Sequence, residues 1–191
     1  MNTGPSQGDG AGPAAFRAAL GRFASGVTVV STVDPEDGVD HALTASAFTS
    51  VSLDPPLILV SINRGGRFHD PVLRSGRWAV SLLSREGKAA ATWFATSGRP
   101  LAGQLERVPH RRGDRTGAAL LSDALAWLEC ETWAVYDGAD HSLLVGAVLH
   151  AEVDENVNDP LLYYRSHYAS LVPSRTSEKA PAPVRPERDA G

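Results

Sequence analysis

The stretch LTASAFTSVSLDPPLILVSIN, residues 43–63, carries the strongest indication of the fold in this chain of 191 residues. It contains a small, hydroxyl-rich segment, ALTASAF (42–48), and an apolar segment, LILVSI (57–62), with turn residues between them. Alternating or β-branched segments bounded by turn residues predict strands. Four comparable segments flank this stretch: VTVVSTV (27–33), WAVSLL (78–83), AWLECETWAVY (126–136) and SLLVGAVLHAEV (142–153). The sequence therefore predicts six strands.

Helical patterns are too few to connect these strands as a parallel sheet. Two short helical stretches, 67–74 and 85–94, interrupt the strands, whereas a doubly wound sheet needs a crossover helix after each strand. We therefore expect a mainly β protein, an antiparallel barrel or sandwich of six strands with a few flanking α-helices. A further helix is expected over 14–24, where Phe16, Leu20 and Phe23 recur at helical spacing, and we expect it to lie on the core.

One strand carries large aromatic and acidic side chains on the same face. Trp127, Glu129, Glu131 and Trp133 alternate with more apolar neighbours, so all four share one side of the strand. An exposed face with two tryptophans is unfavourable for a monomer, and we expect an interface to cover them. We expect both carboxylates to form a solvated or interface rim.

Length and composition predict a single domain with tails. Residues 14–172 form the expected domain, while 1–13 and the proline-rich stretch 173–191 are expected to be disordered. The N-terminus has neither a basic nor an apolar region of the kind that marks a signal peptide, and no apolar run approaches the length of a membrane helix. We expect a cytoplasmic protein that does not bind membranes.

The charge and the metal-binding residue types exclude further classes. The formal net charge of −4 gives no basic field for nucleic acid, so we expect no nucleic-acid partner. Cys130 is the only cysteine, which excludes an internal disulfide and a multi-cysteine metal site. The histidines show no metal-ligand spacing, and we assign no metal. Only two of the 18 basic residues are lysines, Lys88 and Lys179, and arginine is the residue that grips phosphate with a planar fork.

Residues 61–67 resemble a seat for phosphate. Ser61 and Asn63 lie two apart at the end of an apolar strand and project from one face; Gly65 and Gly66 then turn the chain towards Arg67. Such a junction offers a hydroxyl, an amide, backbone N–H groups and a guanidinium to one phosphate. A polar strand-to-helix turn without a ligand is the alternative.

The strand before it suits a planar ligand. Thr44, Ser46 and Ser50 recur with a period of two, and Ala45 and Ala47 leave room beside the backbone, so a flavin can lie edge-on against them. The alternative is a half-exposed strand with ordinary hydroxyls.

The ordered motifs resemble those of the short-chain flavin reductases, the reductase components of two-component flavin-dependent monooxygenases. The resemblance runs through about 14–170 and rests on these segments: GRFASGVTVVST (21–32), LTASAFTSVSLDPPLILVSIN (43–63), the helix with His69-Asp70, RWAVSLLS (77–84), ALAWLEC (124–130), ADHSLLVGAVLHAEV (139–153) and PLLYYRSHY (160–168). It implies a Greek-key, FMN-binding split barrel, a homodimer with the flavin near its interface, and hydride transfer from NADH or NADPH to FMN or FAD. The reduced flavin would go to a separate monooxygenase.

The resemblance also implies roles for single residues. Thr44, Ala45 and Ser46 would line the flavin ring and ribityl chain, and Ser50 and Val51 would offer backbone groups to the isoalloxazine edge. The remaining implied flavin contacts are Ser61, Asn63 and Arg67 at the phosphate, Ile62 between them, and Tyr164 with Tyr168 near the interface. His141 would lie close to flavin and nicotinamide and act in catalysis. Ser166, in place of an expected glycine, and the loop 99–117 depart from the family pattern.

Two other functions stay open from the residues. A non-catalytic FMN-binding or flavin-storage protein would need the same barrel, and a self-contained FMN oxidase would need acid–base groups that the motifs lack. The sequence leaves open FMN or FAD, NADH or NADPH, tight binding or diffusion of the flavin, and the identity of the oxygenase.

Overall fold

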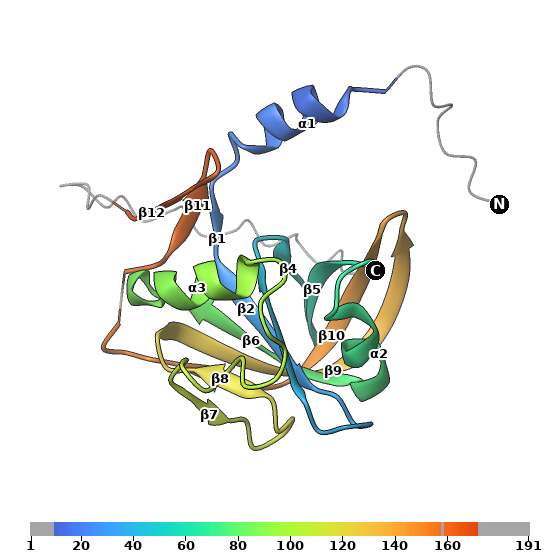
Figure 1. Ribbon diagram of the computed structural model, residues 1–191, viewed down its shortest axis with the longest axis vertical. Helices are drawn as coiled ribbons and strands as arrows, with labels where there is room; N and C mark the ends of the chain where they lie inside the picture. Colours follow the sequence, from blue (N-terminus) through green and yellow to red (C-terminus); the bar gives the residue numbers. More distant parts are fainter. Residues whose placement is uncertain (1–9, 158, 172–191) are drawn as a thin grey trace, which may run out of the picture.

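The computed structural model describes residues 10–157 and 159–171 (Figure 1). Its centre is one antiparallel sheet in the order β3-β2-β6-β9-β10-β5-β4. The strands are β2 (Thr28–Val33), β3 (Asp40–Ala45), β4 (Phe48–Leu53), β5 (Pro56–Asn63), β6 (Arg77–Leu83), β9 (Ala124–Gly138) and β10 (His141–Val153). The predicted tail residues 1–9 and 173–191 lie outside the described residues.

Short elements surround this sheet. One small sheet has the order β1 (Ser25–Gly26), β11 (Leu162–Tyr164), β12 (His167–Ala169), and a second pairs β7 (His110–Arg112) with β8 (Ala119–Leu121). The helices are α1 (Pro13–Leu20), α2 (His69–Ser75) and α3 (Lys88–Ala95), with a 3₁₀ turn, η1 (Arg85–Gly87), before α3. The expected mainly β, antiparallel fold with a few helices is confirmed. Among the described residues, no helix combines the length and the apolarity needed to cross a bilayer.

The expected count of six strands is not confirmed, because the sheet has seven. ALTASAF was expected to form one strand, but β3 ends at Ala45 and a separate strand, β4, starts at Phe48. Three of the six residues of β4 carry hydroxyl groups, Thr49, Ser50 and Ser52, and its pairing with β5 is bulged at Val51, so it lacks the continuous apolar character of β5. Within the described residues no ladder joins β3 to β4, so hydrogen bonds do not close the sheet into a barrel.

The order of the strands nevertheless requires the sheet to roll. β3 and β4 are its two edges, yet only Ser46 and Ala47 separate them in the chain. A flat sheet of seven strands is about 29 Å wide at the usual strand spacing, whereas three Cα steps span at most about 11 Å. The backbone N–H of Ser61 on β5 donates to Ala47 O at 3.1 Å, which holds this bend against the far edge. The edges therefore approach each other.

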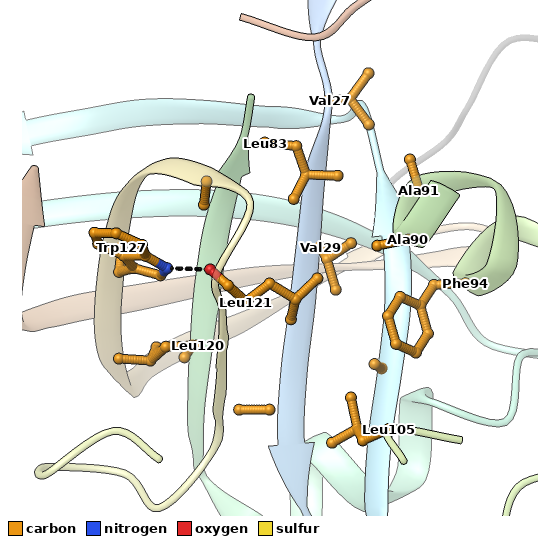
Figure 2. Packing of buried hydrophobic residues seen from close by; sticks show 14 of the residues in the cluster. Val27, Val29, Leu83, Ala90, Ala91, Phe94, Leu105, Leu120, Leu121 and Trp127 are labelled. Atoms are coloured by element: carbon orange, nitrogen blue, oxygen red, sulfur yellow. Dashed lines mark hydrogen bonds between the residues drawn. The ribbon is translucent and has the colours of Figure 1, made fainter. Parts of the chain in front are cut away.

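A core fills the inside of the rolled sheet. Its side chains come from both halves of the strand order and include Val30, Ile58, Val60, Ile62, Trp78, Val80, Cys130 and Leu144. A second core lies outside the sheet, where α3 and β8 cover β2 and β6; Figure 2 shows Ala90, Ala91 and Phe94 of α3 against Val27 and Val29.

Helix α1 does not lie on this core, so that prediction is wrong. Figure 1 shows α1 extending away from the large sheet, and no residue of α1 is buried. Phe16 and Leu20 are each 55% exposed and Phe23, just after the helix, is 75% exposed. The apolar side chains do recur at helical spacing, but this spacing does not tell which surface packs against them.

The predicted face with two tryptophans and two carboxylates is also corrected. Trp127 is buried, and its indole N–H donates to Leu121 O at 2.7 Å (Figure 2). Glu129 is 1% exposed, and its Oε2 accepts hydrogen bonds from the backbone N–H groups of Arg115 and Thr116 at 2.9 and 2.8 Å. The segment around β7 and β8 covers this half of the face, and only Glu131 and Trp133 remain exposed.

Candidate functional site

A pocket of about 420 Å³ lies where the two edges of the sheet approach. The β4 ladder ends at the pair Phe48–Val60, so the last residues of β5 lie at a free edge across from β3. We call this gap the seam and its cavity the seam pocket. Its walls come from β3 (41–43), from the end of β5 (Ile62 and Asn63) and from the turn 65–68. The end of α3 and the loop after it complete the pocket with residues of 94–101 and with Gln104.

The turn after β5 has the local shape that the sequence predicted, but it uses some of its own donors. The Asn63 side-chain oxygen accepts from Gly65 N at 2.8 Å, and Gly66 N donates to Asn63 O at 3.1 Å. A Cβ at either glycine would lie 3.1–3.2 Å from these oxygens, so the tight turn favours glycine at both positions. The two N–H groups that we expected to bind phosphate are therefore occupied, which leaves the guanidinium of Arg67 and the side-chain amide N–H groups of Asn63 as donors at this turn.

A second arginine, Arg99, enters the seam pocket from the loop after α3. Arg67 Nη1 donates to Arg99 O at 2.8 Å, which holds the two residues side by side. Burial lowers the pKa of the Arg99 guanidinium, and the positive charge of Arg67 lowers that pKa further. No sequence pattern predicts Arg99 as a site residue, because a lone arginine in an irregular loop has no periodicity.

Arg64 serves a different purpose from its neighbours. Its guanidinium donates to Asp137 Oδ1 at 2.7 Å and to His141 O at 3.1 Å, and its backbone N–H donates to Asp140 O at 3.0 Å. These bonds fasten the turn after β5 to the hairpin between β9 and β10. Arg64 therefore positions the turn rather than facing the pocket.

His141 lies beside Asn63. The two residues are directly opposite each other in the β10–β5 ladder, so their side chains share one face at neighbouring positions. His141 Nδ1 lies 2.8 Å from Asp140 Oδ1, and this hydrogen bond lowers the pKa of Asp140. Since Nδ1 faces the carboxylate, it carries the proton in the neutral ring, and Nε2 is left for a ligand.

The residue after His141 takes part in a chain of three side chains. Ser142 Oγ lies 2.9 Å from His69 Nε2, and His69 Nδ1 lies 2.7 Å from Asp70 Oδ1. Ser142 is 4% exposed, so its hydroxyl cannot reach a substrate as a nucleophile. The chain instead ties the start of α2 to the start of β10. Together with Arg64, it anchors both ends of the segment that carries Arg67.

Some residues of the hydroxyl-rich segment 42–48 support the fold, and others are exposed. Thr44 Oγ1 donates to Ala91 O of α3 at 2.7 Å, and Ala45 is buried in the inner core. Ser46 lies in the bend and lines two neighbouring pockets of about 560 and 400 Å³, which also share Phe23 and Phe48. Sequence reasoning did not assign either phenylalanine to a site.

The other predicted flavin contacts lie outside the seam pocket. Ser50 and Val51 are exposed at the β4 bulge. Ser61 faces outward beside the bend, on the same face as Asn63. Tyr164 lies on the β11–β12 hairpin, 39% exposed, with the Arg165 guanidinium 5.7 Å from its ring centre.

The structure thus brings one part of the predicted set together and separates the rest. Ile62, Asn63 and Arg67 line the seam pocket, and His141 adjoins it across the strand pair. Ser46 lines the neighbouring pockets, where Tyr163 and Arg165 of the hairpin take the place that we expected for Tyr164. The arrangement offers cations at one end and an apolar, hydroxyl-bearing wall at the other, which suits an elongated anionic ligand with a planar head.

Comparisons with known proteins converge on one family. Residues 20–172 match the family described as flavin reductase like domain. An NADH-dependent flavin reductase of Rhodococcus sp is 40% identical over 160 residues, which cover 83% of this chain and 86% of that protein. The reductase subunit HsaB of a flavin-dependent monooxygenase of Mycobacterium tuberculosis is 31% identical over 166 residues, or 86% of each chain. Among solved structures, BorF, the flavin reductase component of a bacterial two-component tryptophan halogenase, superposes with a TM-score of 0.79 at 40% identity, covering 85% of this chain and 100% of its own.

Proposed function

The chain belongs to the flavin reductase-like family, and we propose that it transfers hydride from NADH or NADPH to FMN or FAD and supplies the reduced flavin to a separate monooxygenase. The observation that carries this proposal is the pairing of His141 with Asn63 at the seam. It joins the turn that would hold the flavin phosphate to the residue that would meet the nicotinamide. Relatives named as an NADH-dependent flavin reductase and as a monooxygenase reductase subunit support the reaction and the partner.

The residues of the seam suit the phosphate end of a flavin. Arg67 supplies a guanidinium, and Ser61 and Asn63 supply a hydroxyl and an amide on one face of β5. Within residues 10–157 and 159–171, no carboxylate lies within ion-pair distance of Arg67. Its charge is therefore free to meet a phosphate. Ile62 is the core-facing residue between them and closes the pocket wall.

The ring end would lie along the bend between β3 and β4. Ser46, Ser50 and Val51 are accessible there, whereas Thr44 and Ala45 act from behind by holding α3 and filling the core. Tyr164 would close this end from the β11–β12 hairpin. A flavin bound here accepts a hydride from a stacked nicotinamide, and that chemistry belongs to the two cofactors.

The protein's own contribution is orientation. Asp140 holds the His141 ring through Nδ1, which leaves Nε2 to bind the nicotinamide amide or a reduced flavin. Ser142, held by His69, fixes the backbone beside His141. No nucleophile is needed, which fits the buried position of Ser142 and Cys130.

Nicotinamide oxidation with purified full-length protein tests the proposal. We expect NADH or NADPH to be oxidised in the presence of FMN or FAD and not in their absence. His141→Ala is expected to lower kcat about tenfold, the effect of losing one hydrogen bond in the transition state. His150→Ala, on the same strand and exposed, serves as the control and should leave kcat unchanged. A protein that binds flavin tightly but oxidises neither nicotinamide would instead be a flavin-storage protein.

We also propose that residues 14–172 form one split-barrel domain and that the protein is cytoplasmic. We further propose that the protein is a homodimer. The support is apolar surface without cover: Phe16, Leu20 and Phe23 near α1, and Trp133 at 59% and Tyr136 at 57% exposure on β9. Light scattering after size exclusion is expected to give twice the mass of one chain. A monomeric mass at micromolar concentration would contradict the dimer.

A further inference from the structure

A second pocket, of about 500 Å³, adjoins the seam pocket, and Gln104 lines both. We call it the loop pocket, because the loop after α3 forms most of its wall. One side of α3, parts of the loop 100–109, and Asp123 just before β9 line it. The proposed hydride transfer does not involve these residues.

The wall of the loop pocket is aromatic and rich in proline. Trp93 of α3 and Val108 of the loop line it together with Pro100 and Pro109. The Trp93 indole N–H donates to Gln104 O at 2.9 Å, which fixes the ring against the loop. Aromatic-lined grooves of this kind bind proline-rich segments, because such segments are extended beforehand and lose little conformational entropy on binding.

Two carboxylates give the loop pocket a preference for basic ligands. Glu106 and Asp123 both line it and both are exposed. Within residues 10–157 and 159–171, neither carboxylate lies within ion-pair distance of a basic group. A proline-rich segment that also carries arginine or lysine therefore suits both the wall and its charges.

The chain itself contains such a segment, KAPAPVRPER, at residues 179–188. Its prolines at 181, 183 and 186 include the spacing Pro183-Val-Arg-Pro186, which is typical of ligands recognised in the polyproline II conformation. The segment has three basic residues, Lys179, Arg185 and Arg188, and one acidic residue, Glu187. Its composition is thus complementary to that of the loop pocket.

The described part of the chain ends beside the helix that forms the pocket wall. Tyr168 of β12 packs against the same outer core as Trp93 and Val108, and its hydroxyl lies beside the Thr92 side chain of α3. Leu171 follows three residues later, and Pro181 comes ten residues after Leu171. Ten residues span up to about 31 Å as polyproline II, whereas α3, with 8 residues, is about 12 Å long. The segment can therefore reach the loop pocket of its own chain.

We propose that residues 181–186 dock in the loop pocket of the same chain, with the prolines against Trp93 and the neighbouring basic side chains on Glu106 and Asp123. The tether makes this binding intramolecular. A linker of ten residues gives an effective concentration of about 1 mM, so a contact with a Kd of about 0.1 mM holds the segment in place for about 90% of the time. A segment that is disordered on its own orders on a surface of this kind.

Cleavage by a lysine-specific endoproteinase tests the docking in the full-length protein, since Lys88 and Lys179 are the only lysines. We expect cleavage after Lys179 to be about tenfold slower in the full chain than in a synthetic peptide of residues 172–191, because only the undocked tenth is open to the protease. Lys88, at the start of α3, reports unfolding of the domain and is expected to be cleaved more slowly still.

Changes in the loop pocket are expected to remove this protection. Glu106→Gln combined with Asp123→Asn should raise the rate at Lys179 at least fivefold. Ala89→Trp, at an exposed position of α3, fills the pocket and should have the same effect. Asp114→Asn removes an exposed carboxylate that lies outside the loop pocket and should leave the rate unchanged.

Each other result overturns the docking. Equal rates at Lys179 in the full chain and in the peptide would refute it. Protection that survives either the paired carboxylate changes or Ala89→Trp, at an unchanged melting temperature, would place the segment outside the loop pocket. Protection that increases with protein concentration would place it on a neighbouring copy and refute docking within one chain.

Discussion

Replacing Glu129 by alanine is expected to destabilise the protein far more than the same change at Glu131. The carboxylate of Glu129 accepts three hydrogen bonds, from Arg115 N at 2.9 Å, from Thr116 N at 2.8 Å and from Thr116 Oγ1 at 2.8 Å. A hydrogen bond to a charged group contributes about 1.5–3 kcal/mol, but the loop is partly open to water, which can replace some of these partners. We therefore expect Glu129→Ala to lower the free energy of unfolding by about 3 kcal/mol.

The assay is thermal and urea unfolding of both variants beside the unaltered protein. A loss of about 3 kcal/mol lowers the melting temperature of a domain of this size by about 6–12 °C. Glu131→Ala, two residues further along β9 on an exposed position, is expected to shift it by less than about 2 °C. Equal shifts in the two variants would refute the burial of Glu129 beneath the 113–118 loop. Glu129→Gln keeps one acceptor oxygen and should fall between them.

Three further changes test other parts of the fold. Gly146→Ala places a Cβ 2.4 Å from the ring of Trp78, which is fully buried, and should lower the free energy of unfolding by about 1–3 kcal/mol in urea titration; an unchanged midpoint would contradict this contact. Ser166→Gly should raise it by about 0.5–1 kcal/mol, because Ser166 has a left-handed φ of 64°, and a lower melting temperature would argue against that conformation. Burial, reinforced by the charge of Glu129, raises the pKa of the Cys130 thiol to about 12, so a disulfide reagent at about pH 8 should modify it only on unfolding; rapid labelling of the native protein would show an accessible thiolate. The same shift makes the contribution of Cys130 to stability decrease as the pH rises above the thiol's unfolded pKa, about 9.

Ser166 shows how a departure in sequence acquires a physical meaning. The family resemblance led us to expect glycine there, and the structure places Arg165 and Ser166, both with positive φ, in the two-residue turn between β11 and β12. A two-residue turn with both central residues at positive φ matches the twist of the two strands, and positive φ favours glycine. The sequence identified the position, and the backbone explains it.

Strand periodicity predicted most of the large sheet but missed its edge. Five of the six predicted segments became β2, β5, β6, β9 and β10 with small changes in their ends. The sixth divided at Ser46 and Ala47, where the chain crosses from one edge of the sheet to the other. Periodicity reports which residues share a face, and it carries no information about where a sheet must turn.

The shape of the turn after β5 was predictable because its signal is local. Asn63, two glycines and Arg67 lie within five residues, and the turn closes through bonds among its own members. Arg99 was not predictable, since it reaches the same pocket from 32 residues away through a loop without a repeating pattern. The turn depends on residues that are neighbours in the sequence, whereas the position of Arg99 depends on how α3 packs against β3.

The sequence by itself determined that this chain is a mainly β, antiparallel protein of the flavin reductase-like family, with a glycine turn after β5 and a histidine at the start of β10. The tertiary structure alone decided that His141 and Asn63 are neighbours, that Glu129 is buried while Glu131 is exposed, and that Arg67 and Arg99 share one pocket. The physical reason is the range of the interactions. Hydrogen bonds and side-chain periods between near neighbours fix strands and turns, but burial and the meeting of distant charges depend on the sheet rolling until its edges approach.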